Sequence, residues 1–318
     1  MRVVVVSAAV GPLRAPEATG AVRAGWQETV PRDDVRTHIL SDGARGLRDA
    51  LGASSGTVVV ETGDLLDRSD AAFHGGSTDA VARALLDAVD GGARRVVFGM
   101  GPSRVHDGGA GLLRVVRERW GDLVTARAAL GGVELVVAGA DPLPLLGLHG
   151  AGALLAPVVG AREAQDREAE VARFAAAVEE ELAPLDLVTG RRVRWSGVPY
   201  GGLAGGAGFA LLALGARAAG GFELTAVETS LEDEVASADL CVAVLEVLDA
   251  VALERSAVSA VAPGALEAAI PVVVISGEDQ TSRRHRAALG IAGVHTSELN
   301  AASLRDMARR VARTWSHG

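Results

Sequence analysis

Residues 94–113 combine the residue types of a loop that binds phosphate or carboxylate groups. The apolar run 96–98, preceded by two arginines, predicts a strand covered on both faces. Glycines that would let the backbone approach a ligand closely follow at Gly99, Gly101, Gly108, Gly109 and Gly111. Asp107 is placed to cap a helix that begins directly after the loop. This order of strand, loop and helix predicts a cradle for an anionic group, with Ser103 and Arg104 as further candidate contacts.

The charge of the chain limits its partners. All 31 basic residues are arginine, and lysine is absent. The 40 acidic residues give a formal net charge of −9, which argues against non-specific binding of nucleic acid or of an anionic membrane surface. Cys241 is the only cysteine, so an intrachain disulfide and a cysteine-based zinc site are excluded. We therefore expect a cytoplasmic protein that binds neither nucleic acid nor membrane.

Three apolar segments have the composition of strands or core rather than of targeting or membrane segments. The N-terminal MRVVVVSAAVGPL is stopped by Gly11 and Pro12, which predicts a first strand rather than a signal peptide. The uncharged runs 142–161 and 197–216 reach membrane-spanning length. Their prolines and glycines do not suit a continuous apolar helix, so both runs predict protein core.

Strand-like apolar runs alternate with amphipathic segments along the chain. The runs that predict strands are 3–6, 35–40, 58–60, 96–98, 135–137, 240–244 and 272–275. The segments that predict helices are 77–89, 161–182, 257–268 and 301–313. This alternation predicts an α/β fold with a mostly parallel sheet. A length of 318 residues exceeds what one hydrophobic core comfortably supports, so two domains are expected.

The segment GMGPSRVHDGGAGLL, residues 99–113, resembles the GIGGSATNDGGAGML-like segment of the glycerate kinase family. Further segments resemble that family in the same order along the chain. They are MRVVVV at the N-terminus, SDGARG at 41–46, the pair Ser77 and Thr78, residues 141–151, LAPVVGA at 155–161, VPYGGLAGGAG at 198–208, and the apolar run 270–277. The order of these matches is not expected by chance, so the resemblance extends over most of the chain.

The resemblance implies two α/β domains and the ATP-dependent phosphorylation of glycerate. One domain would be Rossmann- or flavodoxin-like and discontinuous, made of residues 1–55 and 236–318. The other, an inserted α/β domain, would span residues 56–235. It would carry two glycine loops, 99–111 and 200–208, which we expect to form a cleft between the domains. The implied cofactors are ATP and Mg²⁺, the implied partner is a small hydroxy acid, and a homodimer is left open.

The chain departs from the family where charged chemistry would lie. The family's PDSxK segment reads SAAVG at residues 7–11, and the lysine of its GPQKG segment is Val159. Its GEGRxDxQTxxGK segment corresponds to 244–256, which keeps Asp249 but loses the arginine and the lysine. The acid of its DVTNPL segment aligns with Ala140, beside Asp141. Phosphoryl transfer needs positive charge at the transferring group, so these losses favour a paralogue that has kept the fold without the reaction.

Two hypotheses therefore stay open. In the first, an active kinase, Asp42, Asp249 and Asp141 serve metal or base roles, while Arg45 and Arg104 hold the substrate carboxylate or the phosphates. The remaining ligand contacts would come from the glycine loops and their neighbours: Gly101, Ser103, Asp107, Gly108, Gly109, Ser77, Thr78, Gly205 and Gly206. In the second, a pseudo-enzyme binds a small acid or a protein partner in the cleft.

One further residue and one exclusion complete the set of candidates. His106 stands where the family has an asparagine and is a candidate for titration or for a hydrogen bond to a ligand, although a lone loop histidine is more often polar filler. No two histidines have the spacing of metal ligands, so no resident metal site is predicted.

Overall fold

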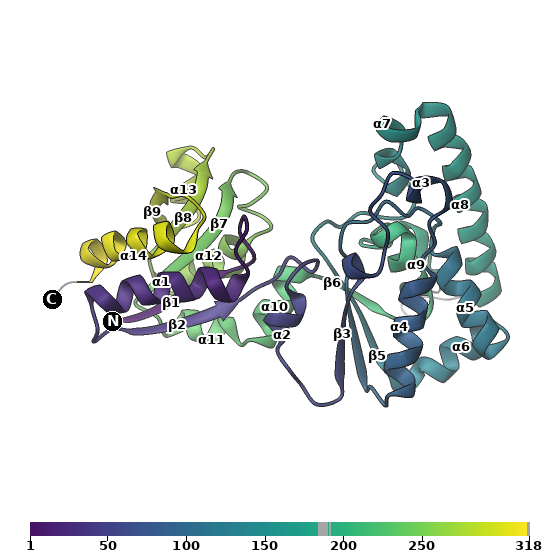
Figure 1. Ribbon diagram of the computed structural model, residues 1–318, viewed down its shortest axis with the longest axis horizontal. Helices are drawn as coiled ribbons and strands as arrows, with labels where there is room; N and C mark the ends of the chain where they lie inside the picture. The colour runs from purple at the N-terminus through teal and green to yellow at the C-terminus, as the bar shows by residue number, and fades with distance from the viewer. Residues whose placement is uncertain (184–189, 191, 317–318) are drawn as a thin grey trace. The chain divides into compact units, whose positions relative to one another are not determined.

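The computed structural model describes residues 1–183, 190 and 192–316. The chain folds into two compact units, each with its own β-sheet (Figure 1). Unit 1 contains Met1–Gly52 and Gly221–Gly318, and unit 2 contains Ala53–Gly220. The α/β fold predicted from the sequence is confirmed.

Unit 1 is built on a five-stranded parallel sheet. Its strands are β1 (Arg2–Ser7), β2 (Asp34–Ile39), β7 (Leu240–Leu248), β8 (Val272–Asp279) and β9 (Ile291–Thr296). Their order in the sheet is β2-β1-β7-β8-β9. Counted within unit 1 alone, this is the 2-1-3-4-5 order of flavodoxin-like folds, in which ligands bind at the carboxyl ends of the strands where the strand order reverses. In unit 1 that position lies between β1 and β7.

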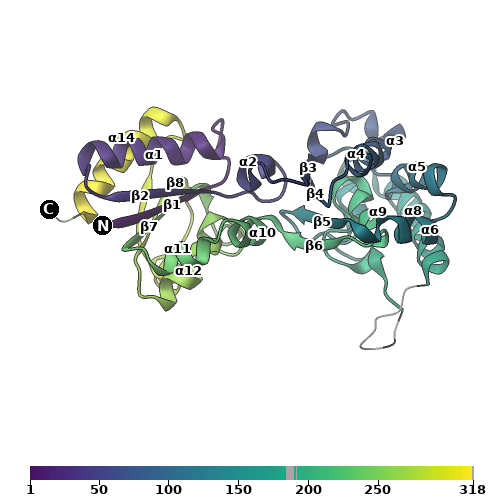
Figure 2. The ribbon, with the colours of Figure 1, turned by 90° about the horizontal axis from the view of Figure 1, so that it is seen from below.

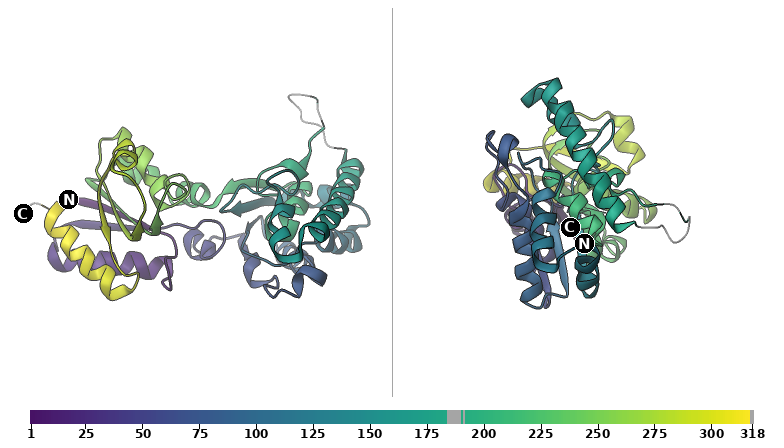
Figure 3. Two further views of the ribbon diagram at one scale, coloured as in Figure 1. Left: turned by 90° about the horizontal axis from the view of Figure 1, so that it is seen from above. Right: turned by 90° about the vertical axis from the view of Figure 1, so that its right-hand side faces the viewer.

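Helices cover both faces of the unit 1 sheet (Figures 2 and 3). The helices α1 (Ala15–Thr29) and α14 (Ala301–Trp315) cover one face, and α11 (Leu231–Ala236) and α12 (Ala257–Glu267) cover the other. The shorter helices of this unit are α2 (Leu47–Leu51), α10 (Gly221–Glu228) and α13 (Arg283–Ala288). Gly25 lets α1 approach α14 closely, because a Cβ at this position would overlap the backbone of Arg305.

Unit 2 is built on a four-stranded parallel sheet in the order β3-β4-β5-β6. Its strands are β3 (Thr57–Glu61), β4 (Arg95–Gly99), β5 (Glu134–Gly139) and β6 (Arg217–Gly220). Its α-helices are α3 (Ala72–Gly75), α4 (Asp79–Asp90), α5 (Ala110–Trp120), α6 (Leu123–Ala129), α7 (Ala156–Val159), α8 (Ala161–Leu182) and α9 (Ala207–Ala213). The buried core of unit 2 joins Val96 and Phe98 of β4 to residues of α4, α5, α8 and α9.

The seven strands expected from apolar runs are all present, and two more escaped prediction. Strand β6 has no β-branched residue and is partly exposed, and β9 is largely exposed or half-buried and carries a glycine, so neither shows a continuous apolar run. The structure groups residues 221–235 with unit 1, whereas the sequence analysis placed them in the inserted domain. These residues belong to unit 1 because Leu231 and Val235 of α11 pack in its core.

The two long uncharged runs contribute to unit 2. The run 197–216 contains α9, all of whose residues are buried. Within the described part of the chain, no helix is both long enough and apolar enough to cross a membrane.

Candidate ligand-binding site

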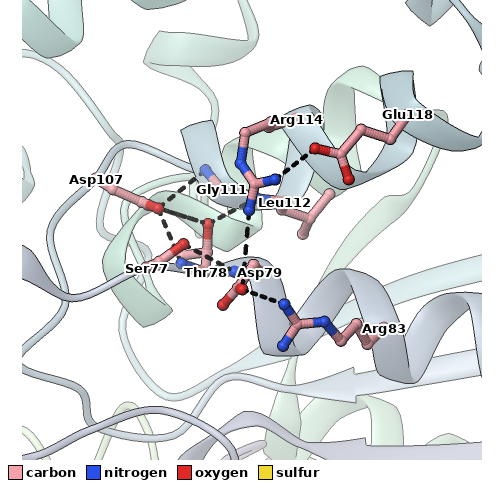
Figure 4. A network of polar contacts seen from close by, with 9 residues as sticks. All are labelled: Ser77, Thr78, Asp79, Arg83, Asp107, Gly111, Leu112, Arg114 and Glu118. Carbon is pink, nitrogen blue, oxygen red and sulfur yellow. Dashed lines mark hydrogen bonds and ion pairs between the residues drawn. The ribbon is translucent and has the colours of Figure 1, made fainter.

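Asp107 is the centre of a hydrogen-bond network that joins the starts of α4 and α5 (Figure 4). Its carboxylate accepts hydrogen bonds from the backbone N–H groups of Thr78, Gly109 and Gly111, at 2.8, 2.9 and 3.0 Å. The Thr78 hydroxyl lies 3.0 Å from both carboxylate oxygens and itself accepts the N–H of Leu112 at 3.0 Å. Both oxygens of Asp107 are therefore engaged in holding the loop to the two helices.

The neighbouring predicted contacts serve the same network. Thr78 is fully buried. The hydroxyl of Ser77 accepts the N–H of Asp79 at 3.3 Å, at the first turn of α4. Asp79 in turn pairs with Arg83 at 2.6 Å and lies 3.9 Å from Arg114 on α5 (Figure 4). These contacts fasten α4 to α5, so Ser77 and Thr78 act first as structural residues of unit 2.

The two glycine loops touch each other inside unit 2. Gly108 and Gly109 have φ values of 66° and 84°, and Gly205 and Gly206 have values of 72° and 94°, all in the left-handed region that favours glycine. A Cβ at Gly206 would lie 2.5 Å from the Gly108 Cα, and one at Gly109 would lie 2.6 Å from the Gly206 carbonyl oxygen. The sequence analysis expected the loops to enclose a cleft between the domains. Both loops lie in unit 2 and their backbones are in contact, and the cleft between the domains stays a prediction.

The first part of the glycine loop is fixed in a similar way. The N–H of Gly101 donates to the Thr62 hydroxyl, which donates to the Gly99 carbonyl, each at 3.0 Å. Ser103 accepts the N–H of Val105 at 2.9 Å. The Arg104 guanidinium lies over the Phe73 ring, 5.0 Å from its centroid, and its Nε is 3.8 Å from the Asp70 carboxylate.

The three candidate catalytic carboxylates are divided between the units. Asp42 follows β2 in unit 1 and accepts the N–H of Ala44 at 2.8 Å. Asp249 follows β7 in unit 1 and accepts the N–H of Ala252 at 2.7 Å. Asp141 follows β5 in unit 2. The structure thus places two of them at the carboxyl edge of one sheet and the third at the carboxyl edge of the other.

Arg45 belongs to the same loop as Asp42, after β2 of unit 1. Its carbonyl accepts the Ser41 hydroxyl at 3.2 Å. Among the described residues, no group of three or more histidine, cysteine, aspartate or glutamate side chains is placed to hold a metal ion.

A cavity of about 420 Å³ lies in unit 2 beside the Asp107 network. It is lined by residues of α3 and the glycine after it, of the glycine loop, of the start of α5 and of α8: Ala72, Phe73, His74, Gly75, Gly76, His106, Asp107, Ala110, Arg167, Glu170, Val171 and Phe174. Burial, and then the nearby charge of Arg167, lower the pKa of His106 below its ordinary value, and the Asp107 carboxylate opposes this shift. His106 is therefore a neutral imidazole near pH 7, able to donate one hydrogen bond and accept another.

Sequence reasoning identified His106 and Asp107 but missed the wall that α8 contributes. Arg167, Val171 and Phe174 recur at spacings of four and three residues, which places them on one face of a helix. That spacing could have grouped them. Only the fold shows that this face meets the glycine loop.

Comparison with known proteins identifies the protein family to which the chain belongs. A sequence model of the glycerate kinase family matches residues 117–317. An uncharacterized protein of Mycobacterium bovis is 31% identical, over 96% of this chain and 86% of its own length. A glycerate kinase of Halalkalibacterium halodurans is 27% identical, over 83% of this chain and 82% of its own length.

The fold agrees with these sequence matches. A solved structure described as glycerate kinase 2 from Salmonella typhimurium LT2 superimposes with a TM-score of 0.76 at 22% identity, covering 99% of this chain and 98% of that one. The chain belongs to the glycerate kinase family, as its motifs predicted.

Proposed function

We propose that this chain binds a small hydroxy acid and has lost the phosphoryl transfer of its family. The observation that carries the proposal lies at the carboxyl ends of β1 and β7, the position where flavodoxin-like sheets bind ligands. By the resemblance stated above, the family's PDSxK and GEGRxDxQTxxGK segments correspond to residues 7–11 and 244–256, at and after these two strand ends, and their two lysines and one arginine are replaced here. At the end of β1 the family's acid aligns with Ala8 and its lysine with Gly11, and neither residue carries a charge.

A further replaced charge is in unit 2. Val159, at the position of the family's GPQKG lysine, packs against the buried residues Phe73, Leu155 and Ala164. An apolar side chain in an apolar cluster cannot neutralise the charge of a transferring phosphoryl group, which is the main task of a kinase site. The Asp107 network and the interlocked glycine loops, by contrast, are complete.

An active kinase is the second candidate, and specific residues favour it. Asp42 and Asp249 follow strands of the same parallel sheet, and Arg45 and Arg104 supply permanent positive charge. Mg²⁺ is commonly held by one or two carboxylates together with substrate phosphates, and in this candidate function the two aspartates would take that role. In this candidate function Mg-ATP is the phosphoryl donor, and the arginines hold the glycerate carboxylate or the phosphates.

A paired assay separates the two functions. Thermal unfolding of the full chain is measured with D-glycerate, with Mg-ATP and with both, and ADP formation is measured in the same samples. An acid at a hundred times its Kd stabilises the folded state by about 2.7 kcal/mol, a shift of roughly 5–10 °C for units of this size. We expect stabilisation by acid without acid-dependent ADP release.

The glycerate kinase of Halalkalibacterium halodurans serves as the positive control for turnover. Acid-dependent ADP formation by the present chain that is lost in Asp249→Ala would establish the kinase instead. If no acid shifts the unfolding temperature, the binding function is wrong as well.

A further inference from the structure

We propose that the cavity of unit 2 is the acid-binding site and that its ligand is a monocarboxylic hydroxy acid with an apolar substituent, anchored by Arg167. This inference rests on the proposed binding function and adds the location and the ligand class. The cavity volume of about 420 Å³ lies within the roughly 300–1,000 Å³ typical of small-molecule sites. A three-carbon acid would fill only part of this volume, and water molecules, at about 30 Å³ each, would occupy the rest.

Arg167 is held in position with most of its donors unused. Its side chain is 19% exposed. Its Nη2 donates to the Glu163 carboxylate at 2.7 Å and lies 3.0 Å from Nδ1 of His74. Both contacts use the same nitrogen, so Nε–H and the two Nη1–H groups make no hydrogen bond to any residue that the structure describes. A guanidinium fixed on one side with three N–H groups remaining is suited to a carboxylate.

The walls of the cavity favour a ligand with an apolar part. Phe73 of α3 and Val171 and Phe174 of α8 line it. The Phe174 ring packs edge-on against Phe209, with 6.5 Å between centroids, so the wall is anchored to the core. Burial of apolar surface contributes about 25 cal/mol per Å². Glycerate carries a polar group on every carbon and offers this wall nothing.

The remaining polar groups limit the charge of the ligand. Glu170 lines the cavity and would repel a second negative charge, while the Asp107 carboxylate is already occupied by its own loop. His106 is placed to exchange a hydrogen bond with a hydroxyl group. One carboxylate, one hydroxyl and an apolar substituent therefore match the lining better than a dicarboxylate or a phosphate.

Isothermal titration of the full chain with 3-phenyllactate, 2-hydroxy-4-methylpentanoate and D-glycerate tests the inference. We expect the two substituted acids to bind at least tenfold more tightly than glycerate. Arg167→Gln should weaken their binding at least tenfold, and Glu170→Gln should strengthen it severalfold. Arg173→Gln, which changes an exposed arginine of the same helix outside the cavity, should alter it less than twofold.

The outcomes distinguish this inference from the function on which it rests. Glycerate binding as tight as that of the larger acids, or binding unaffected by both Arg167→Gln and Glu170→Gln, would overturn the inference and leave acid binding in place. Phosphorylation of a bound acid by ATP would overturn the non-catalytic function, while an Arg167-dependent affinity would still support this site. If Arg167→Gln does not fold, the surface substitution Glu170→Gln decides alone, since unchanged affinity would then overturn the inference.

Discussion

Asp107→Asn should destabilise unit 2, because both oxygens of this carboxylate are engaged. The substitution is nearly isosteric, but one oxygen becomes an NH₂ group that faces backbone donors instead of accepting from them. If that group takes the place of Oδ1, the hydrogen bond from the N–H of Gly109 is lost, and if it takes the place of Oδ2, those from Thr78 and Gly111 are lost. Hydrogen bonds to a charged group contribute about 1.5–3 kcal/mol each. Since Asp107 is only half-buried, we take the lower value for each of the one or two lost bonds and expect a loss of about 1.5–3 kcal/mol.

Urea unfolding combined with hydrogen exchange measures this loss where it occurs. The two units need not unfold together, so one transition for the whole chain would be ambiguous. Exchange followed by mass spectrometry should show lost protection in peptides that cover 78–86 and 107–116, with unit 1 unchanged. Asp70→Asn is the matched control, since the Asp70 side chain is 85% exposed and its stability change should stay within about 0.5 kcal/mol.

A negligible effect of Asp107→Asn on stability would refute this reasoning. If the variant kept its stability but lost acid binding, Asp107 would be a ligand contact instead of a structural residue. The two roles predict opposite patterns, so a single variant measured in both assays separates them.

Three further predictions concern backbone packing, pH and thiol reactivity. Gly206→Ala should lower the free energy of unfolding by about 2–4 kcal/mol, because φ is 94° and a Cβ would lie 2.5 Å from the facing glycine loop. Gly92→Ala is the control: its φ is 80° but the space around it is open, so it should cost about 1 kcal/mol. Equal urea midpoints for the two variants would contradict the packing argument. Burial, together with a nearby guanidinium, holds the pKa of His106 below its ordinary 6.5. The unfolded state therefore binds the proton more readily than the folded state. The stability that the neutral His106 side chain contributes is lost as pH falls below about 6.5. His106→Gln should flatten the decline in urea midpoint between pH 7 and pH 5, and parallel curves would disprove this assignment. Burial raises the pKa of Cys241 to about 12, so iodoacetamide at pH 8 should label the folded chain at least a hundredfold more slowly than the urea-unfolded chain.

The sequence predicted the fold well because apolar runs and ordered motifs act locally. The run 96–98 became β4, and the segment 161–182 became α8 with the predicted bounds. It placed Asp107 at the start of α5 for the same reason, since contacts at a helix start join residues close in sequence; the N-cap residue itself is Gly109, and the Asp107 carboxylate accepts the N–H of Gly111 in the first turn. The additional bond from Asp107 to Thr78 spans 29 residues, and no local pattern indicates it.

The cavity was not predictable, because its walls come from segments far apart in sequence. Phe73 on α3, His106 in the loop and Arg167 on α8 meet only through the packing of unit 2. The same limit applies to the contact between the two glycine loops. A glycine that permits close approach to a ligand and a glycine that permits close approach to another loop look identical in sequence.

That ambiguity changes what the retained glycines mean. The intact loops were the main reason to expect a working kinase. Gly109 and Gly206, however, are required by contact between the two loops, whether or not a ligand binds. Any side chain at either position would strike backbone, so these residues would persist after catalysis had ceased. The charged positions have no such structural requirement, since Val159, at one of the family's lysine positions, packs in an apolar cluster without a charge. Under the proposed function, the replaced charges at the ends of β1 and β7, rather than the retained glycines, therefore bear on whether this chain transfers a phosphoryl group.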